Sequence, residues 1–259
     1  MKRRQLLRYT GATFLTAVGA TWLSSLTPSA AQTLEEKVTV EWLGHTCFLF
    51  TGNGRRILVN PFRNLGCTAG YAPINVEADI VLISSQMLDE GAADVVPGNP
   101  KVLYEPGVYE LNGMKIEGIA IDHDRVGGRR FGKNIAWKWT QGGVNILHLG
   151  GAAAPITLEQ KILMGRPDLA LIPVGGGMKA YDPQEAKQAL QALNPKVVIP
   201  THYQTTAANE EACDLVSVEK FLSLTEGIPV GRLNTNKIAI RPQDLPKESP
   251  VIRVMQYSR

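Results

Sequence analysis

The 259-residue sequence predicts an α/β fold, built as a layered α+β domain, and three observations lead to this. In the first half, short apolar runs alternate with glycine turns, which is typical of strands joined in hairpins. In the second half, apolar runs alternate with helical patterns, which is typical of β–α–β units. No repeat, low-complexity tract or linker divides the chain, so we expect one domain over residues 36–259. The hydrophobic content of 44% excludes a disordered or collagen-like chain.

The predicted strands of the first half are short apolar runs bounded by turn residues. They cover residues 38–43, 47–51, 56–60, 80–84, 101–104, 114–121, 135–140 and 144–149. The turns at 51–54 and 141–143 contain glycine, as tight hairpins require.

The second half predicts helices and strands in alternation. Asp182 and Pro183 mark one helix start, because Asp caps a helix and Pro fits its first turn. Asn194-Pro195 ends that helix. The expected elements are helices at 156–164, 183–193 and 216–224, and strands at 169–174 and 197–200. Three prolines (Pro242, Pro246 and Pro250) predict an irregular course for the C-terminal residues.

The first 31 residues indicate a twin-arginine export signal. Lys2, Arg3 and Arg4 begin it, and residues 9–26 form an apolar stretch without a charge. Small residues at 27–31 predict cleavage. An uncleaved membrane anchor is the alternative, since the apolar stretch could just span a bilayer. Because this route carries folded proteins, we expect folding in the cytoplasm and a final location in the periplasm or an equivalent extracytoplasmic compartment.

The net charge of +3 does not indicate a nucleic-acid partner. Four basic residues and no acidic residue lie in the signal, so 23 basic and 24 acidic residues remain in the mature domain. That domain has no basic block longer than a pair, whereas binding to a phosphate backbone uses a basic patch or stripe. We expect no nucleic-acid partner, and no stable membrane span after signal removal.

The three cysteines do not indicate a disulfide framework, because their number is odd and no C-x-x-C pair occurs. Cys47 lies in an apolar run and is expected in the core. Cys67 and Cys213 lie in polar, loop-like contexts. No residue near Cys67 in the sequence would lower the pKa of its thiol, so we do not expect a reactive cysteine.

Polar residues follow three predicted strands, at the edge where layered α/β folds gather functional groups. These stretches are 84–91 (SSQMLDEG), 122–124 (DHD) and 201–202 (TH). They supply the candidate site residues.

Five segments carry a family resemblance: 42–50 (WLGHTCFLF), 55–62 (RRILVNPF), 78–91 (ADIVLISSQMLDEG), 168–186 (DLALIPVGGGMKAYDPQEA) and 194–205 (NPKVVIPTHYQT). Together they resemble the metallo-β-lactamase superfamily, in the branch that includes L-ascorbate-6-phosphate lactonase and related small hydrolases. The resemblance implies an αββα sandwich with a metal site along one edge of its two sheets. In that family a T-H-x-H-x-D-H signature binds two metals, which make hydroxide from a bound water.

In this sequence most of the signature is replaced. Ser85 stands for the first His, Met87 for the second and Glu90 for the last, whereas Asp89 is kept. Gly151 stands where the family carries a bridging Asp. The resemblance therefore implies that a two-metal centre has been lost, and a thioether is too soft to replace an imidazole on zinc.

A single metal site remains possible on the same resemblance. Asn60 replaces an upstream Asp of the family, and His123 and His202 match its later histidines. Asp89, Glu90 and His202 could bind one ion, with His123 as a fourth ligand or as a general acid/base. Two carboxylates and an imidazole suit Zn, Mn or Fe, so the expected cofactor is either none or one such divalent ion.

Each candidate also has a structural interpretation. Asp89 and Glu90 could cap or charge a helix beginning at Gly91. His202 could be a hydrogen-bonded core residue, and His123 a solvated loop residue.

The remaining polar candidates favour structural roles. His45 could orient backbone or face a pocket, and His148 lies within a strand. The three glycines at 175–177 fit a tight turn at a strand end. This segment is only weakly indicated as a phosphate-binding loop, because it lacks the Lys and Ser/Thr of such a loop.

The sequence therefore favours an exported protein of this fold that has lost the two-metal hydrolytic centre. Its role would be non-catalytic binding of a small molecule or protein partner, or a structural one. The alternative is an enzyme: a one-metal hydrolase of a small ester, lactone or phosphoester.

Overall fold

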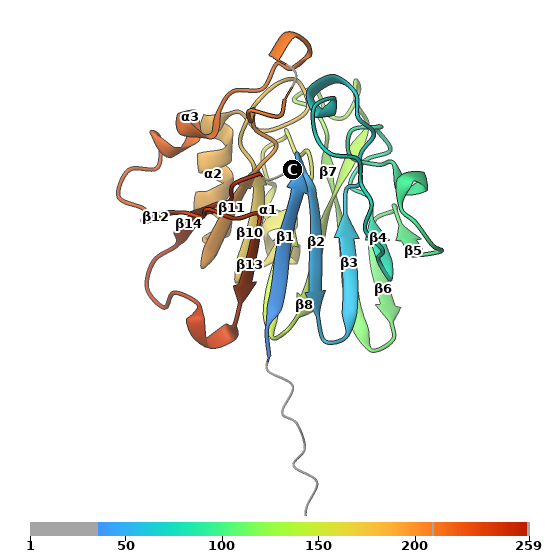
Figure 1. The fold of residues 1–259 in the computed structure, drawn as a ribbon. Helices are drawn as coiled ribbons and strands as arrows, with labels where there is room; N and C mark the ends of the chain where they lie inside the picture. Colours follow the sequence, from blue (N-terminus) through green and yellow to red (C-terminus); the bar gives the residue numbers. More distant parts are fainter. Residues whose placement is uncertain (1–35, 209, 258–259) are drawn as a thin grey trace, which may run out of the picture. The chain divides into compact units, whose positions relative to one another are not determined.

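The computed structural model describes residues 36–208 and 210–257 and contains two β-sheets packed face to face (Figure 1). Because the chain forms two sheets accompanied by a few helices, the predicted mixed α/β sandwich is confirmed. The signal predicted for residues 1–31 lies outside the described residues. In the described part of the chain, no helix is long and apolar enough to cross a membrane.

The first sheet has six strands in the order β13-β1-β2-β3-β4-β5. The hairpins predicted between the first three strands form, with antiparallel pairing of Val40 with Phe50 and of Phe50 with Ile57. The pairs β3–β4 and β4–β5 are parallel. The bounds are β1 Val38–Gly44, β2 Cys47–Gly52, β3 Arg55–Val59, β4 Ile80–Leu82, β5 Lys101–Leu103 and β13 Lys237–Ile240.

The second sheet has eight strands in the order β12-β14-β11-β10-β9-β8-β7-β6. Strands β6 to β9 form an antiparallel meander, and β9, β10, β11, β14 and β12 are parallel. The bounds are β6 Gly107–Leu111, β7 Met114–Asp122, β8 Lys133–Gln141, β9 Val144–His148, β10 Leu169–Pro173, β11 Val197–Thr201, β12 Val230–Arg232 and β14 Val251–Val254.

In the part of the chain that the structure describes, three α-helices belong to the eight-stranded side: α1 (Leu158–Met164), α2 (Pro183–Leu193) and α3 (Val218–Leu222). Helix α1 contacts β7, α2 contacts β10, and α3 contacts α2. The predicted start of α2 is confirmed, since the Asp182 carboxylate accepts the N–H of Glu185 at 2.8 Å. Asn194 ends α2 with a left-handed backbone (φ 45°).

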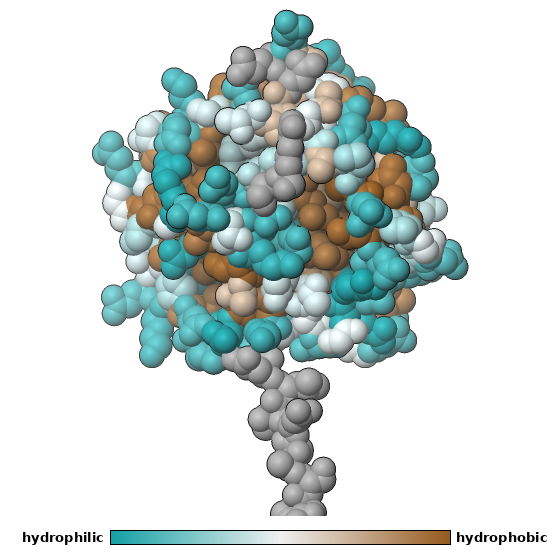
Figure 2. Space-filling model, in the orientation of Figure 1, coloured by the Kyte–Doolittle hydropathy of each residue, from teal (hydrophilic) through white to brown (hydrophobic). Residues whose placement is uncertain are grey.

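Successive side chains of β2 point to opposite faces of the six-stranded sheet, and both faces are buried. Phe48 and Phe50 point into the main core, where Phe50 packs edge-on against Trp139 with ring centroids 4.9 Å apart. Cys47 and Leu49 point the other way, into a second cluster. Loops and 3₁₀ turns, rather than α-helices, cover that cluster within the described ranges. On the face drawn in Figure 2, hydrophilic residues lie over most of the surface, with apolar residues between them.

The C-terminal part is more regular than its prolines predict. It supplies β12 and β14 to one sheet and β13 to the other. Pro242 begins a short 3₁₀ turn and Pro250 precedes β14, so these prolines lie at element boundaries, where they remove no ladder hydrogen bond.

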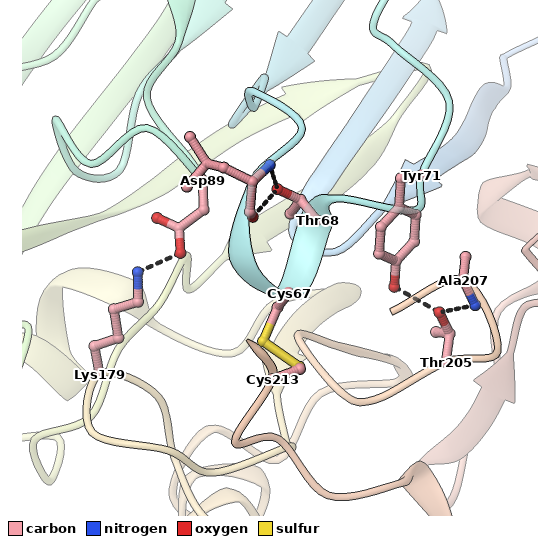
Figure 3. The surroundings of a disulfide bond; sticks show 9 residues. Cys67, Thr68, Tyr71, Asp89, Lys179, Thr205, Ala207 and Cys213 are labelled. Atoms are coloured by element: carbon pink, nitrogen blue, oxygen red, sulfur yellow. Dashed lines mark hydrogen bonds and ion pairs between the residues drawn. A yellow bond between two sulfur atoms is a disulfide. The ribbon is translucent and has the colours of Figure 1, made fainter. Parts of the chain in front are cut away.

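The expectation of no disulfide framework was wrong for one pair. Cys67 and Cys213 form a disulfide across 146 positions of sequence (Figure 3). It joins the 3₁₀ turn at Gly66–Thr68 to the loop after the 3₁₀ turn at Glu210–Ala212. Neither local sequence nor cysteine count reveals which distant loops meet. Cys47 is a buried free cysteine, as predicted.

Candidate functional site

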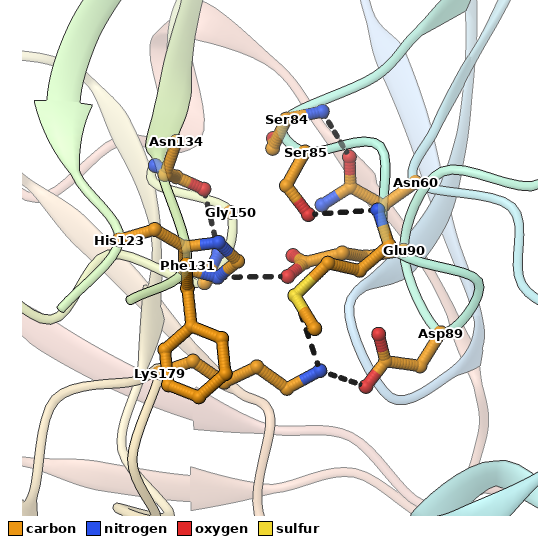
Figure 4. Close-up of polar contacts among 12 residues, drawn as sticks. Asn60, Ser84, Ser85, Asp89, Glu90, His123, Phe131, Asn134, Gly150 and Lys179 are labelled. Atoms are coloured by element: carbon orange, nitrogen blue, oxygen red, sulfur yellow. Dashed lines mark hydrogen bonds and ion pairs between the residues drawn. The ribbon is translucent and has the colours of Figure 1, made fainter. Parts of the chain in front are cut away.

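The candidate residues lie together on the loops that follow the strands at one edge of the sandwich (Figure 4). The contributing loops follow β1, β3, β4, β7, β9, β10 and β11. The residues they carry are His45, Asn60, Ser85, Met87, Asp89, Glu90, His123, Gly151, Lys179 and His202.

Glu90 and His123 form a buried pair at the centre of this edge. Glu90 Oε1 lies 3.0 Å from His123 Nε2, and both side chains are fully buried. Burial opposes the charged carboxylate, but the opposite charge of His123, with smaller contributions from His202 and Lys179, holds the pKa of Glu90 well below its ordinary value. Within the described residues, neither carboxylate oxygen has a well-aligned hydrogen-bond donor.

The structure corrects two of the structural interpretations of the candidate residues. His123 is not a solvated loop residue, because it has no exposed surface. Asp89 and Glu90 do not cap an α-helix, because only a 3₁₀ turn at Ala93–Val95 follows them, with Ala92 as its N-cap.

Asp89 pairs with a cation rather than with the other acid. The Lys179 ammonium donates to the Asp89 carboxylate and lies 3.7 Å from Met87 Sδ (Figure 4). The side chains of Lys179 and Asp89 are only 21% and 15% exposed, so solvent screens the pair weakly.

His45 and His202 stack edge to face at the side of this pair, with ring centroids 4.1 Å apart. Burial lowers the pKa of both imidazoles, and their proximity lowers that of His202 further, so both are neutral at pH 7. Both residues have left-handed backbones (φ 52° and 53°), as does Asn60 (φ 52°). Such non-glycine conformations cost free energy and gather at functional sites.

Gly151 lies directly against the Glu90–His123 pair. A Cβ atom there would lie 2.6 Å from His123 Nε2 and 2.8 Å from Glu90 Oε1. The Gly151 N–H donates to Asn134 Oδ1 at 2.9 Å, which fixes the loop in this place. The space that a bridging Asp would need is therefore filled by the Glu90 and His123 side chains.

Ser85, which the resemblance aligns with a ligand position of the family, and Asn60, which replaces its upstream Asp, have small local roles. Ser85 Oγ accepts the N–H of Met87 at 3.4 Å, and Asn60 Oδ1 accepts the N–H of Ser84 at 2.9 Å. These contacts hold the loop after β4 against the end of β3.

Two further polar residues are structural. The Gly150 N–H donates to His148 Nδ1, so Nε2 carries the proton and donates to the Thr46 carbonyl at 3.1 Å. His148 is therefore fully used by backbone, as its position within a strand predicts. Desolvation opposes the charge of Asp124, but four backbone N–H groups of its loop lower its pKa to about 2.

A pocket of about 190 Å³ opens beside these residues. It is lined by His45, His202, Asp89 and Lys179, together with Phe131, the loop at 176–178 and the turn that carries Cys67. The disulfide (Figure 3) joins two loops that both contribute residues to the lining of this pocket.

The side chains do not fit a two-metal centre. Ser85 and Met87 offer no imidazole, and the bridging position is a glycine whose surroundings are filled. Over residues 36–208 and 210–257, no three His, Cys, Asp or Glu side chains lie where they could share one ion. Of the four predicted ligands, Glu90 and His123 are in contact, whereas Asp89 is paired with Lys179.

Lys179 and the disulfide are the site features that the sequence did not predict. Lys179 follows a glycine-rich turn in a stretch without a ligand motif, and it reaches Asp89 across 90 positions of sequence. Only the tertiary structure brings these groups together.

The family model described as a beta-lactamase superfamily domain matches residues 39–202. The chain belongs to the metallo-β-lactamase superfamily. Within it, a metal-dependent hydrolase of Thermococcus onnurineus is 31% identical over 193 residues, 65% of this chain and 85% of that relative. A metal-dependent hydrolase of Thermoplasma acidophilum is 25% identical over 197 residues, 66% of this chain and 85% of that relative.

A solved structure agrees with this membership. A protein of Thermotoga maritima, assigned as a Zn-dependent hydrolase of the metallo-β-lactamase superfamily, has a TM-score of 0.67 and 31% identity. The match covers 84% of this chain and 98% of that one. Homologues of this metallo-β-lactamase-fold protein are thus named as metal-dependent hydrolases.

Proposed function

We propose that this is an exported metallo-β-lactamase-fold protein that has lost the two-metal hydrolytic centre and binds a small molecule without hydrolysing it. It would derive from the branch that resembles the L-ascorbate-6-phosphate lactonase-like hydrolases. The pocket beside the former centre would be the binding site.

The observation that carries the proposal is the space around Gly151. An acid at this position would have to enter the volume that His123 and Glu90 occupy, since even a Cβ would lie within 3.0 Å of both. The absence of an acid at position 151 and the burial of the Glu90–His123 pair therefore depend on each other. Reverting a single residue would not restore the centre.

The chemistry of the pocket supports binding of a small molecule. His45 Nε2 and His202 Nδ1 are buried without a hydrogen-bond partner within the described residues. Unpaired buried polar atoms are costly, so a ligand that bonds to them gains affinity. A volume near 190 Å³ suits a molecule of about one ring, since an engineered cavity of ~150 Å³ holds benzene.

Metal analysis of the purified protein tests the proposal. The full chain is expressed with its leader, and the mature form is purified without chelator or metal-affinity resin. We expect far less than one Zn, Mn or Fe per chain by elemental analysis, and no turnover of small esters, lactones or phosphoesters. Near-stoichiometric metal that disappears in Asp89→Ala and His202→Ala would overturn the proposal.

The second candidate is the one-metal hydrolase. It is favoured by the unpaired atoms of Glu90, His123 and His202, which a bound ion would satisfy once these side chains move closer together. It requires Asp89 to leave Lys179, because Asp89 and that ammonium are in contact. The metal analysis above distinguishes the two candidates, and a metal-dependent lactonase or esterase activity would establish this one.

Export by the twin-arginine route is also part of the proposal. The residues that support it are Arg3 and Arg4, followed by the uncharged stretch at 9–26. The Cys67–Cys213 disulfide agrees with an extracytoplasmic location, since such bonds persist in oxidising compartments. Replacing both arginines with lysine should retain the protein in the cytoplasm on cell fractionation, and unchanged export would reject this route.

A further inference from the structure

Lys179 supplies a positive charge in a place where the family would bind a metal ion. We propose that the Lys179 ammonium replaces the second metal ion as the fixed cation of this site, and that it excludes divalent metals. This inference rests on the proposed function, because it explains how a metal-free site stays metal-free. It makes Lys179 a specificity-determining residue of the pocket.

The position of the ammonium carries the argument. The resemblance gives the second metal three ligands, which are Asp89, Glu90 and His202. The ammonium contacts the first of them directly. Lys179 also lines the same pocket as Asp89 and His202. The lysine therefore contacts one of the three groups and shares a pocket with a second.

The neighbours of the ammonium suit a lysine better than a metal. Two adjacent acids would repel each other in this place, and each has a nitrogen partner of its own. Lys179 pairs with Asp89, and His123 pairs with Glu90. Met87, in place of an imidazole, puts a thioether 3.7 Å from the ammonium. A thioether is a weak acceptor and a poor ligand for hard or borderline ions, so it tolerates the ammonium and contributes little to metal binding.

The charge is large enough to control metal affinity. Repulsion between two unit charges about 4 Å apart, at the effective dielectric typical near a protein surface, corresponds to roughly a thousandfold in an equilibrium constant. A divalent ion would be repelled more strongly. Allowing for rearrangement of the side chain, we expect removal of the charge to raise metal affinity by about a hundredfold or more.

The test compares lysine variants for binding of Zn²⁺ and Co²⁺. Lys179→Met removes the charge, and Lys179→Gln removes it while keeping a donor for Asp89. Lys179→Arg retains the charge. Lys161→Met is the matched control, because Lys161 is exposed on α1, away from the site. Affinity is measured by calorimetry, the metal-dependent rise in melting temperature reports binding to the folded state, and Co²⁺ absorption reports the ligand set.

We expect the Met and Gln variants to gain the stated affinity, and the Arg variant and Lys161→Met to resemble the wild type. Adding His202→Ala should abolish the gain. If both neutral variants fold, as judged by circular dichroism, and bind metal no more tightly than the wild type, the assignment of Lys179 is wrong. If only one of them folds, the metal affinity of that variant alone decides whether the assignment of Lys179 stands. If neither folds, the charge is needed for the fold itself and the assignment is rejected. Metal in the purified wild type would instead reject the proposed function, so the two failures are distinct.

Discussion

Removing the Cys67–Cys213 disulfide should lower the stability of the domain substantially. The bond spans 146 positions of sequence, and the loop-entropy relation gives about 5 kcal/mol for a closed loop of this length at 25 °C. Because native disulfides contribute about 2–5 kcal/mol when removed, we expect a loss within that range for the variant Cys67→Ser/Cys213→Ser. Both cysteines are half-buried, so little of this loss should come from packing.

Urea unfolding followed by tryptophan fluorescence measures the effect. At a slope of about 2 kcal/mol/M, the expected loss shifts the midpoint by roughly 1–2.5 M. Wild type in dithiothreitol should match the double variant, whereas the double variant should not respond to the reductant. Cys47 is present in every sample and is a buried free thiol, so thiol titration of denatured, unreduced wild type should find one thiol. Three titratable thiols, or a midpoint that ignores the reductant, would refute the reasoning.

Two further predictions concern packing and pH. Gly151→Ala should lower the free energy of unfolding by about 2 kcal/mol through overpacking, because its Cβ would lie 2.6 Å from His123 Nε2. Because this clash is with the His123 side chain, the loss should shrink in a His123→Ala background; an undiminished loss in urea unfolding would contradict the packing argument. Burial lowers the pKa of His148 to about 4, so the unfolded chain binds a proton there that the folded chain does not. The free energy of unfolding should therefore fall by up to about 3 kcal/mol as pH drops from 6.5 to 4. NMR should find the His148 ring neutral at pH 5 in the folded protein, and titration near pH 6.5 would disprove this.

The sequence predicts the strands and helices that have a local signal. Hairpins with glycine turns and the capped start of α2 are examples, because short-range chemistry determines them. It does not predict β6, β12, β13 and β14, which are short and, in β6 and β12, largely exposed. Their strand conformation depends on pairing with distant partners rather than on their own residues.

The candidate site, too, was predicted from the sequence only in part. The resemblance identifies the strand-end residues, and the structure brings Glu90 and His123 into contact. The partner of Asp89 could not be predicted, because Lys179 belongs to a different loop and a lone lysine carries no motif. The disulfide was missed for the same reason, since pairing of distant cysteines is a property of the folded loops.

The last strands make completion of the domain depend on the end of the chain. Residues 230–254 close one edge of the six-stranded sheet with β13 and place β14 between β11 and β12 in the other sheet. A ribosome-bound chain that still lacks these residues has an open edge in both layers, and exposed edges favour aggregation. Both sheets can be completed only after residue 254 has been synthesised. The order of the strands along the chain thus delays completion of the fold until the end of translation.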